Sequence, residues 1–321
     1  MDTQDAWSLP DPLGEALHSL RMSGTFYCSS EFSAPWGLEL PAMPQCLMFH
    51  VLTSGRCWLQ LDGETPLAMA PGDLVLVPHG RGHRLVDEPG STAQGLFDLP
   101  REPVSERYEI LRHGGGGERA EMVCGALRFD HPLARQLLEA LPRVLVLGAD
   151  EGANGDWLQG TLRFMRDEAR TLRPGGESVI TRLADILVIQ AIRAWLERDP
   201  AARTGWLGAL QDRQVGRALA LIHRDPARNW TLESLAGEVA MSRSAFAARF
   251  SEQVGEPAMH YLARWRMSLA LSWLQDGEMG VGQLAERLGY QSDAAFSRAF
   301  KRFNGMAPGV ARRRLTTSGM A

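Results

Sequence analysis

The side chains best suited to metal chemistry are two histidines and two cysteines in the first 130 residues. His50 and His83 would supply two imidazole nitrogens, and either Cys124 or Cys46 would add a thiolate. Two imidazoles and a thiolate are donors that suit zinc. One hypothesis is therefore a zinc site; its alternative is that each histidine is an ordinary core residue with a hydrogen-bond partner.

The cysteines also support a redox hypothesis. All four lie in the first 124 residues, and no two of them form a CxxC pair. Cys28 and Cys124 could be joined if their Cα atoms lie within about 7 Å. A thiolate beside a protonated His50 or His83 would be more reactive than an isolated one. The alternative for each cysteine is a small buried hydrophobic residue.

A third hypothesis concerns a small organic effector. The first half of the chain is rich in apolar side chains and includes Trp36 and Trp58. A barrel lined by such side chains would offer a largely apolar pocket. Because metal–thiolate sites can themselves be oxidised, the three hypotheses overlap.

Short strands are predicted to position these side chains between residues 38 and 99. Apolar stretches at 47–52, 57–61 and 74–77 are separated by turn signals rich in Gly, Pro and Asp. Regular short strands with such turns predict a sandwich or barrel. Strand alternation places Met48 and His50 on one face, and residues 121–129 are predicted to return as a last strand.

From residue 132 the apolar spacing becomes helical. Helices are predicted at 133–141, 157–172 and 178–198, and residues 200–212 are predicted to be a linker. The longest helix carries a broad apolar stripe that needs a partner. That partner is either the rest of the chain or a second copy in a homodimer, and both alternatives stay open.

The last hundred residues contain an internal near-repeat. Three pairs of residues are each 50 positions apart: Phe246 and Phe296, Phe250 and Phe300, and Gly255 and Gly305. In each copy Ser242 or Ser292 is predicted to cap a helix that buries its two Phe side chains on one face. The opposite face is free to enter a major groove, so each copy is predicted to be a helix-turn-helix unit. An apolar helix at 259–275 joins the two copies.

These residues resemble the AraC/XylS family of transcription regulators over about residues 215–315. The most specific part runs from Gly289-Tyr290-Gln291-Ser292 through the second Phe pair to Gly305 and Pro308. The resemblance implies two recognition helices on one face of promoter DNA, in successive major-groove segments. RNA polymerase is a further partner that the resemblance allows.

The predicted DNA-contacting residues lie off the Phe face of each recognition helix. They are Ser242, Arg243, Ser244, Ala247 and Arg249 in the first helix, and Ser292, Asp293, Ala294, Ser297, Arg298, Lys301 and Arg302 in the second. Arg298 matches a position that the family often uses at a base edge, where Arg pairs well with guanine, while Lys301 and Arg302 are assigned to phosphate. In the first helix the family's usual Arg position is occupied by Ala248. Arg249 follows one residue later, so its alternative role is a salt bridge within the domain.

The N-terminal strands resemble a cupin. Gly72, Pro78, Gly80 and His83 have the spacing of the second cupin motif, which would direct His83 into the barrel. The first cupin motif is degraded, because residues 42–44 contain no histidine and the Glu position is occupied by Met48. Residues 49–58, 78–83 and 123–125 resemble the cupin-type sensor domain of one AraC-family branch. Some members of that branch are thought to respond to oxidants or electrophiles.

Two other functional classes compete with a regulator. Cupins include metal-dependent enzymes, so one alternative is a metal-dependent cupin enzyme fused to a helix-turn-helix domain. The missing His-x-His-Glu set argues against it, because metal catalysis needs a site with an open position. The other alternative is an interaction protein that has lost DNA readout.

Charge and hydropathy restrict the partners. Residues 215–321 contain 14 Arg or Lys and 9 Asp or Glu, a net charge of +5, while residues 1–214 carry −9. A basic end on an acidic chain indicates that this end meets a polyanion. No apolar run reaches the roughly 18 residues of a membrane span, and the acidic start is unlike a signal peptide. A cytoplasmic protein without a membrane partner is therefore expected.

Together these patterns predict an α+β multidomain chain. A cupin-like β-barrel sensor is expected at 1–130, a helical linker or dimerisation region at 131–212, and an all-α DNA-binding domain with two helix-turn-helix units at 213–315. The predicted function is a homodimeric, non-enzymatic transcription regulator controlled by an effector, an oxidant or zinc at the barrel.

Overall fold

The computed structural model describes residues 11–18, 22–129, 131–148, 155–171, 173–275, 277 and 279–318. Its internal contacts divide the chain into two compact units. We call residues 20–130 and 135–198 the barrel unit, and residues 1–19, 131–134 and 199–321 the helical unit. The region predicted as a separate linker, 131–212, is thus shared between the two.

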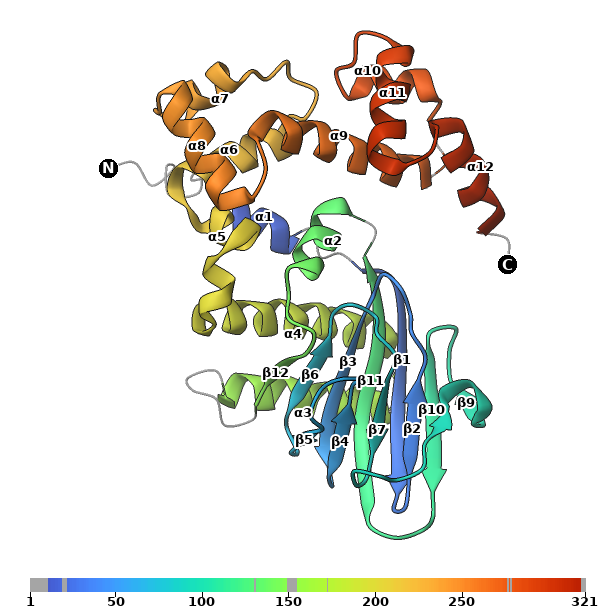
Figure 1. The fold of residues 1–321 in the computed structure, drawn as a ribbon. Coiled ribbons are helices and arrows are strands. Elements are labelled where there is room, and N and C mark those ends of the chain that lie inside the picture. Colours follow the sequence, from blue (N-terminus) through green and yellow to red (C-terminus); the bar gives the residue numbers. More distant parts are fainter. Residues whose placement is uncertain are drawn as a thin grey trace. The chain divides into compact units, whose positions relative to one another are not determined.

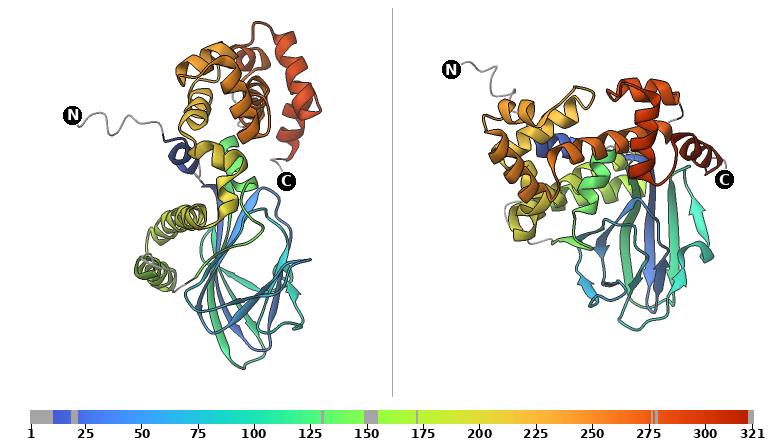
Figure 2. Two further views of the ribbon diagram at one scale, coloured as in Figure 1. Left: turned by 60° about the vertical axis from the view of Figure 1, so that its left-hand side comes forward. Right: turned by 45° about the horizontal axis from the view of Figure 1, so that its top comes forward.

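The barrel unit consists of two sheets that face each other (Figure 2). The larger contains β1 (Met22–Ser33), β3 (Cys46–Ser54), β6 (Leu74–Val77), β9 (Arg101–Pro103), β10 (Tyr108–Gly114), β11 (Arg119–Phe129) and β12 (Leu145–Leu147), in the order β12-β6-β3-β11-β1-β10-β9. The smaller contains β2 (Gly37–Leu40), β4 (Cys57–Gln60), β5 (Leu67–Met69), β7 (His83–Val86) and β8 (Gln94–Gly95), in the order β5-β4-β7-β2-β8. The barrel predicted from the turn-punctuated strands is confirmed.

Two helices accompany the larger sheet on its outer side. They are α3 (Gly155–Thr171) and α4 (Gly176–Arg198), which pack against each other (Figure 2). Their bounds agree within two residues with the helices predicted at 157–172 and 178–198. A short 3-10 helix, η2 (Leu96–Asp98), follows β8. Within the described residues, none of the helices combines the length and hydropathy that a membrane span requires.

Two glycines in the predicted motifs are required by close packing. Gly80 has φ +58°, and a Cβ there would lie 1.9 Å from the carbonyl oxygen of Met43. Gly125 pairs with Phe49 across β11 and β3, and a Cβ there would lie 2.3 Å from the Phe49 ring. Neither position tolerates a side chain. Gly80 is required by the neighbouring backbone, and Gly125 by the neighbouring Phe49 ring.

The helical unit contains α1 (Pro12–His18), η4 (Pro200–Arg203), α5 (Gly205–Gln211), α6 (Arg213–Arg224), α7 (Leu232–Glu238), α8 (Arg243–Val254), α9 (Ala258–Gln275), α10 (Val281–Arg287), α11 (Asp293–Asn304) and α12 (Pro308–Ser318). It also includes the first residues of α2 (Pro132–Glu139). α9 connects the α7–α8 pair to the α10–α11 pair (Figure 1). Residues 200–212, predicted as a linker, contain η4 and α5, and Trp206, Leu207 and Leu210 are buried there.

Candidate recognition helices and the thiols of the barrel core

The first helix-turn-helix pair is α7 and α8. Thr231 and Ser234 form a capping box at the start of α7. The turn that follows places Ala240 at φ +54°, and the amide of Met241 donates to the carbonyl oxygen of Ala236 at 2.9 Å. The Ser242 hydroxyl then accepts from the amide of Ala245 at the start of α8. The predicted cap at Ser242 is confirmed.

The second pair, α10 and α11, repeats this turn. Gly289 takes the left-handed conformation with φ +75°, and the amide of Tyr290 donates to the carbonyl oxygen of Ala285 at 2.9 Å. The Ser292 hydroxyl accepts from the amide of Ala295, which confirms the second predicted cap. Because Gln291 is inserted before the cap, this copy is one residue longer.

The paired Phe side chains fix which face of each recognition helix is available. Phe246 and Phe250 of α8 and Phe296 and Phe300 of α11 are all fully buried. The predicted contact residues of both helices lie on the other face, where they are exposed apart from half-buried Ala247 and Ser297. The structure therefore presents one polar face from each recognition helix.

The basic residues on these faces differ in their surroundings. Arg249 of α8 forms an ion pair with Asp212, with Nη2 and Oδ2 2.5 Å apart, and its Nη1 donates to Gln214 Oε1 at 3.2 Å. Arg243 and Arg298 make no hydrogen bond or ion pair with the described part of the chain. Arg249 thus adopts the alternative role that the sequence left open, while Arg243 and Arg298 remain available.

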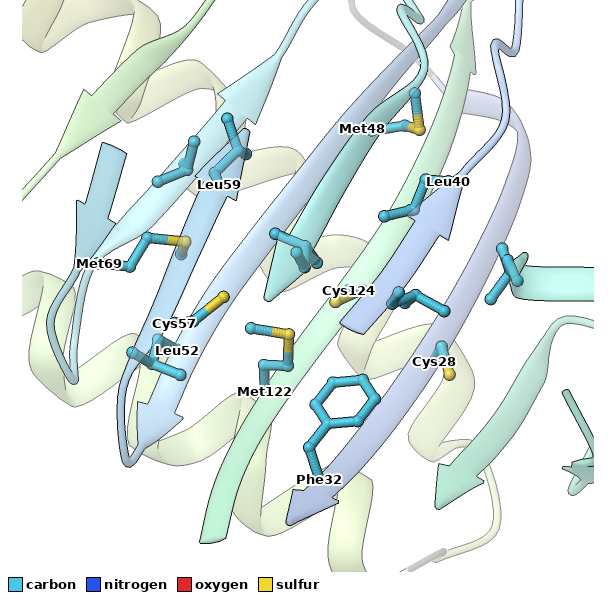
Figure 3. Close-up of a cluster of buried hydrophobic side chains, with 14 of the residues drawn as sticks. Cys28, Phe32, Leu40, Met48, Leu52, Cys57, Leu59, Met69, Met122 and Cys124 are labelled. Carbon is cyan, nitrogen blue, oxygen red and sulfur yellow. The ribbon is translucent and has the colours of Figure 1, made fainter. Parts of the chain in front are cut away.

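In the barrel unit, three predicted site residues form a row across neighbouring strands. Cys28 of β1 lies directly opposite Cys124 of β11, and Cys124 lies directly opposite His50 of β3. Side chains of directly opposed residues point to the same face of a sheet. The row belongs to the core between the sheets, where Figure 3 shows Cys28, Cys124 and a further thiol, Cys57, among apolar side chains.

The row borders a small cavity of about 30 Å³. Its lining includes Cys28, Cys124 and His50 together with apolar side chains such as Met48 and Leu96. A space of this size holds one or two water-sized molecules, whereas pockets for drug-sized organic ligands measure roughly 300–1,000 Å³.

Burial keeps the groups of this row uncharged. It raises the pKa of the Cys28 thiol, and it raises the pKa of Cys124 well above its usual value, with nearby Cys28 and Cys57 adding to the effect. Burial also lowers the pKa of His50 well below its usual value and lowers that of His83. The predicted thiolate beside a protonated imidazole is therefore wrong for this structure, since thiols and imidazoles are both neutral at pH 7.

His50 and His83 meet edge to edge inside the barrel. Their Nε2 atoms are 2.7 Å apart, and Nδ1 of His83 lies 2.9 Å from the carbonyl oxygen of Arg81. A carbonyl oxygen only accepts, so His83 Nδ1 carries its proton and His83 Nε2 accepts from His50 Nε2. This tautomer leaves the buried Nδ1 of His50 without a partner among the described residues.

The predicted zinc ligands come together only in part. His50 and His83 are adjacent, but no group of three His, Cys, Asp or Glu side chains in the described ranges could hold a metal ion. Cys46 lies at the start of β3 opposite Arg128, and burial raises the pKa of its thiol. Zinc needs at least three protein ligands, so the residues as arranged do not fit the ion.

The predicted tryptophans do not border the cavity. Trp36 stacks on Phe32 with ring centroids 4.1 Å apart, and Trp58 lies on β4 opposite Ala68 and Val86. Neither tryptophan is brought to this cavity, and their assignment to an effector pocket stays a prediction. Cys57 of β4, which the sequence did not assign to a site, is buried in the same core, and burial raises the pKa of its thiol to about 12.

Comparison with known proteins agrees with this two-part architecture. Residues 11–197 match a family model described as Cupin, and residues 235–314 match one described as Helix-turn-helix domain. A putative AraC-like transcription regulator from Streptomyces lividans is 34% identical over 309 residues, which cover 95% of this chain and 99% of that protein. The HTH-type transcriptional regulator AlkR from Acinetobacter baylyi is 29% identical, covering 91% and 95%. The RCS-specific HTH-type transcriptional activator RclR from Escherichia coli is 27% identical, covering 95% and 98%.

Proposed function

Since this chain belongs to the AraC-like transcription regulators, with a cupin domain followed by a helix-turn-helix domain, we propose that α8 and α11 are the helices that read its promoter DNA. One observation carries the proposal. Both helices bury a Phe pair completely and present the opposite, exposed face. Relatives over the full length are transcription regulators, which argues against the metal-dependent cupin enzyme.

Within α11 the contacts divide by chemistry. Arg298 is assigned to a base edge in the major groove, where its guanidinium can pair with guanine. Lys301 and Arg302 are exposed one turn later and are assigned to phosphate. In the first unit, the DNA contacts are assigned to residues around the start of α8: Ser242, Arg243, Ser244 and Ala247.

We further propose that a small oxidant acting on Cys28 and Cys124 controls DNA binding. Directly opposed residues of antiparallel strands have Cα atoms about 4.5–5.5 Å apart, within the range of about 4.4–6.8 Å that disulfides span. The adjoining cavity admits a molecule of the size of a peroxide or a hypohalous acid. The small volume of the cavity, about 30 Å³, favours such an oxidant over a larger effector.

The proposed reaction is a two-electron oxidation. The two thiols lose two protons and two electrons as the sulfur–sulfur bond forms. Hydrogen peroxide takes up both and is reduced to two molecules of water, whereas a hypohalous acid would give water and a hydrogen halide. Because burial raises the pKa of both thiols, few thiolates are present at pH 7. The rate of oxidation should therefore rise with pH until the thiols ionise.

The strands that carry Cys28 and Cys124, β1 and β11, are adjacent in sequence to segments of the helical unit. β1 and β11 pair from Met22 and Phe129 to Ser33 and Arg119. α1 precedes β1 and residues 131–134 follow β11, and both segments belong to the helical unit. There the His131 ring lies 6.2 Å from Trp265 of α9. A change in the β1–β11 pairing would reach the DNA-binding helices through these two connections.

A second copy of the chain, RNA polymerase and zinc are three further candidate partners. Phe164 of α3 and Ile186 of α4 are about half exposed, which supports a homodimer formed through these helices. RNA polymerase is proposed as a partner at the promoter, and the cytoplasm as the location where both meet. Zinc at His50 and His83 has less support than oxidation, because a third ligand is missing from the described residues.

One experiment tests both the DNA-binding and the oxidant proposals. DNA selected from a random pool by the full chain is titrated by fluorescence anisotropy with reduced protein and with protein treated with hydrogen peroxide, alongside Cys28→Ser and Cys46→Ser variants. We expect peroxide to change affinity in the unsubstituted chain and in Cys46→Ser, but not in Cys28→Ser. An equal response of all three proteins would reject the Cys28–Cys124 pair. Elemental analysis of the same samples for zinc, and sedimentation analysis for the dimer, complete the test.

A further inference from the structure

Asp212 uses both carboxylate oxygens at the point where the chain enters the helix-turn-helix region. Its Oδ1 accepts from the amides of Gln214 and Val215, each at 2.9 Å, and so caps α6. Its Oδ2 accepts from Arg249 Nη2 at 2.5 Å and from Gln253 Nε2 at 3.1 Å. One side chain thereby fastens the start of α6 to two turns of the recognition helix α8.

The network extends to the turn between α7 and α8. Gln214 accepts from Arg249 through Oε1 and donates through Nε2 to the carbonyl oxygen of Val239 at 3.1 Å. α5 and α6 also pack against α8. Asp212, Arg249 and Gln214 therefore connect the entry to the domain, the recognition helix and the turn that precedes it.

The Asp212 carboxylate is well stabilised as an anion. Its partial burial favours the neutral form, but the hydrogen bonds from Val215, Arg249, Gln253 and Gln214 outweigh this and lower its pKa to about 2. The side chain of Arg249 is 43% exposed and that of Asp212 only 12%. The pair is thus anchored on the domain side rather than formed by two solvated surface chains, which would contribute little.

We propose that Asp212 is a positioning residue for the first recognition helix, and that Arg249 serves this anchor instead of contacting DNA. The proposal rests on the assignment of α8 as a DNA-reading helix. If this assignment holds, the first unit contacts DNA with the residues at the start of α8. The orientation of α8 is then set by Asp212, at the junction between α5 and α6.

The alternative role for Arg249 makes the opposite prediction. If Arg249 contacted a phosphate, Asp212 would compete with DNA for the guanidinium. Removing the Asp212 charge would then strengthen DNA binding, whereas loss of an anchor would weaken it. The sign of this change therefore separates the two roles.

The test compares Asp212→Asn, Arg249→Ala and Lys301→Ala in the full chain. Asn is as good a helix cap as Asp, so Asp212→Asn keeps the cap of α6 and removes the charge. Binding to the selected DNA is measured by anisotropy at several salt concentrations. Each phosphate contact contributes about 0.9 to the slope of log affinity against log salt. Hydrogen exchange of α6 checks that each variant remains folded.

We expect Arg249→Ala and Asp212→Asn to weaken binding about tenfold, the size expected for a lost charged hydrogen bond, without a change in slope. Lys301→Ala should lower the slope by about 0.9. Tighter binding by Asp212→Asn, or a slope lowered by Arg249→Ala, would overturn the anchor. If Lys301→Ala left both the affinity and its salt dependence unchanged, the assignment of α11 as a DNA-contacting helix would fail, whatever the result for Asp212→Asn.

Discussion

The two helix-turn-helix units share one scaffold but place their basic residue differently. Before the second Phe, α8 has Ala248 and Arg249, whereas α11 has Arg298 and Ala299. This exchange of order rotates the guanidinium by one position, about 100°, around the helix. In α8 it reaches Asp212, and in α11 it remains exposed with no partner in the described part of the chain. The duplicated core thus supports one anchored and one available arginine.

The turns of the two units also differ, in the residue that takes the left-handed conformation. Ala240 and Gly289 occupy equivalent left-handed positions, at φ +54° and +75°. The Gly289 backbone lies so close to Ala227 that a Cβ would be 2.2 Å from its carbonyl oxygen. Ala240 is exposed. The second turn therefore depends on glycine, while the first accepts alanine at the cost of backbone strain.

The largest expected effect tests what the units have in common. Phe250→Ala and Phe300→Ala should each destabilise the chain by about 3–5 kcal/mol, because both side chains are fully buried. Native-state hydrogen exchange of α8 and α11 would measure the loss in each unit. A loss in one unit more than about 2 kcal/mol greater than in the other would show that the two cores are not equivalent.

The next effect concerns the second turn. Gly289→Ala adds a Cβ at a positive φ and against the carbonyl oxygen of Ala227. A left-handed L-residue costs about 1–2 kcal/mol, and the clash adds to it, so a loss above about 2 kcal/mol is expected at α10 and α11. Gly305→Ala is the matched control, because Gly305 is also left-handed but has open space around a Cβ. Equal losses of stability in Gly289→Ala and Gly305→Ala would show that the clash with Ala227 contributes nothing beyond the backbone strain.

A smaller effect tests the available arginine. Arg298→Ala should reduce discrimination at one base pair by about 1–3 kcal/mol, measured by competition with single-base variants of the selected DNA. Ala248→Arg places a guanidinium at the equivalent position of α8 and should create new discrimination in the first half of the site. Unchanged base preferences in Arg298→Ala would assign readout to other residues.

The helices of the DNA-binding units could be predicted from the sequence, but the partners of their arginine side chains could not. Phe spacing and the Ser caps are local patterns, so both recognition helices could be predicted within a residue. The pairing of Arg249 with Asp212 joins positions 37 apart and depends on how α6 packs on α8, which no local pattern records.

The barrel shows the same limit. Met48 and His50 were placed on one face by alternation, but β1 was missed, because polar and small residues occupy much of Met22–Ser33. The row of Cys28, Cys124 and His50 needed the register of three strands.

The smallest effect would make the two turns alike. Ala240→Gly removes the strain of an L-residue at positive φ, about 1–2 kcal/mol, but the added freedom of glycine in the unfolded chain costs about 0.5–1 kcal/mol. The net expectation is a stabilisation of about 0.5 kcal/mol, confined to α7 and α8. Hydrogen exchange of these helices, with Ala236→Gly as a control inside α7 that should only destabilise, would detect it. A destabilised Ala240→Gly would mean that the exposed methyl group makes contacts that outweigh the strain, and the difference between the two turns would then lie in packing rather than in backbone conformation.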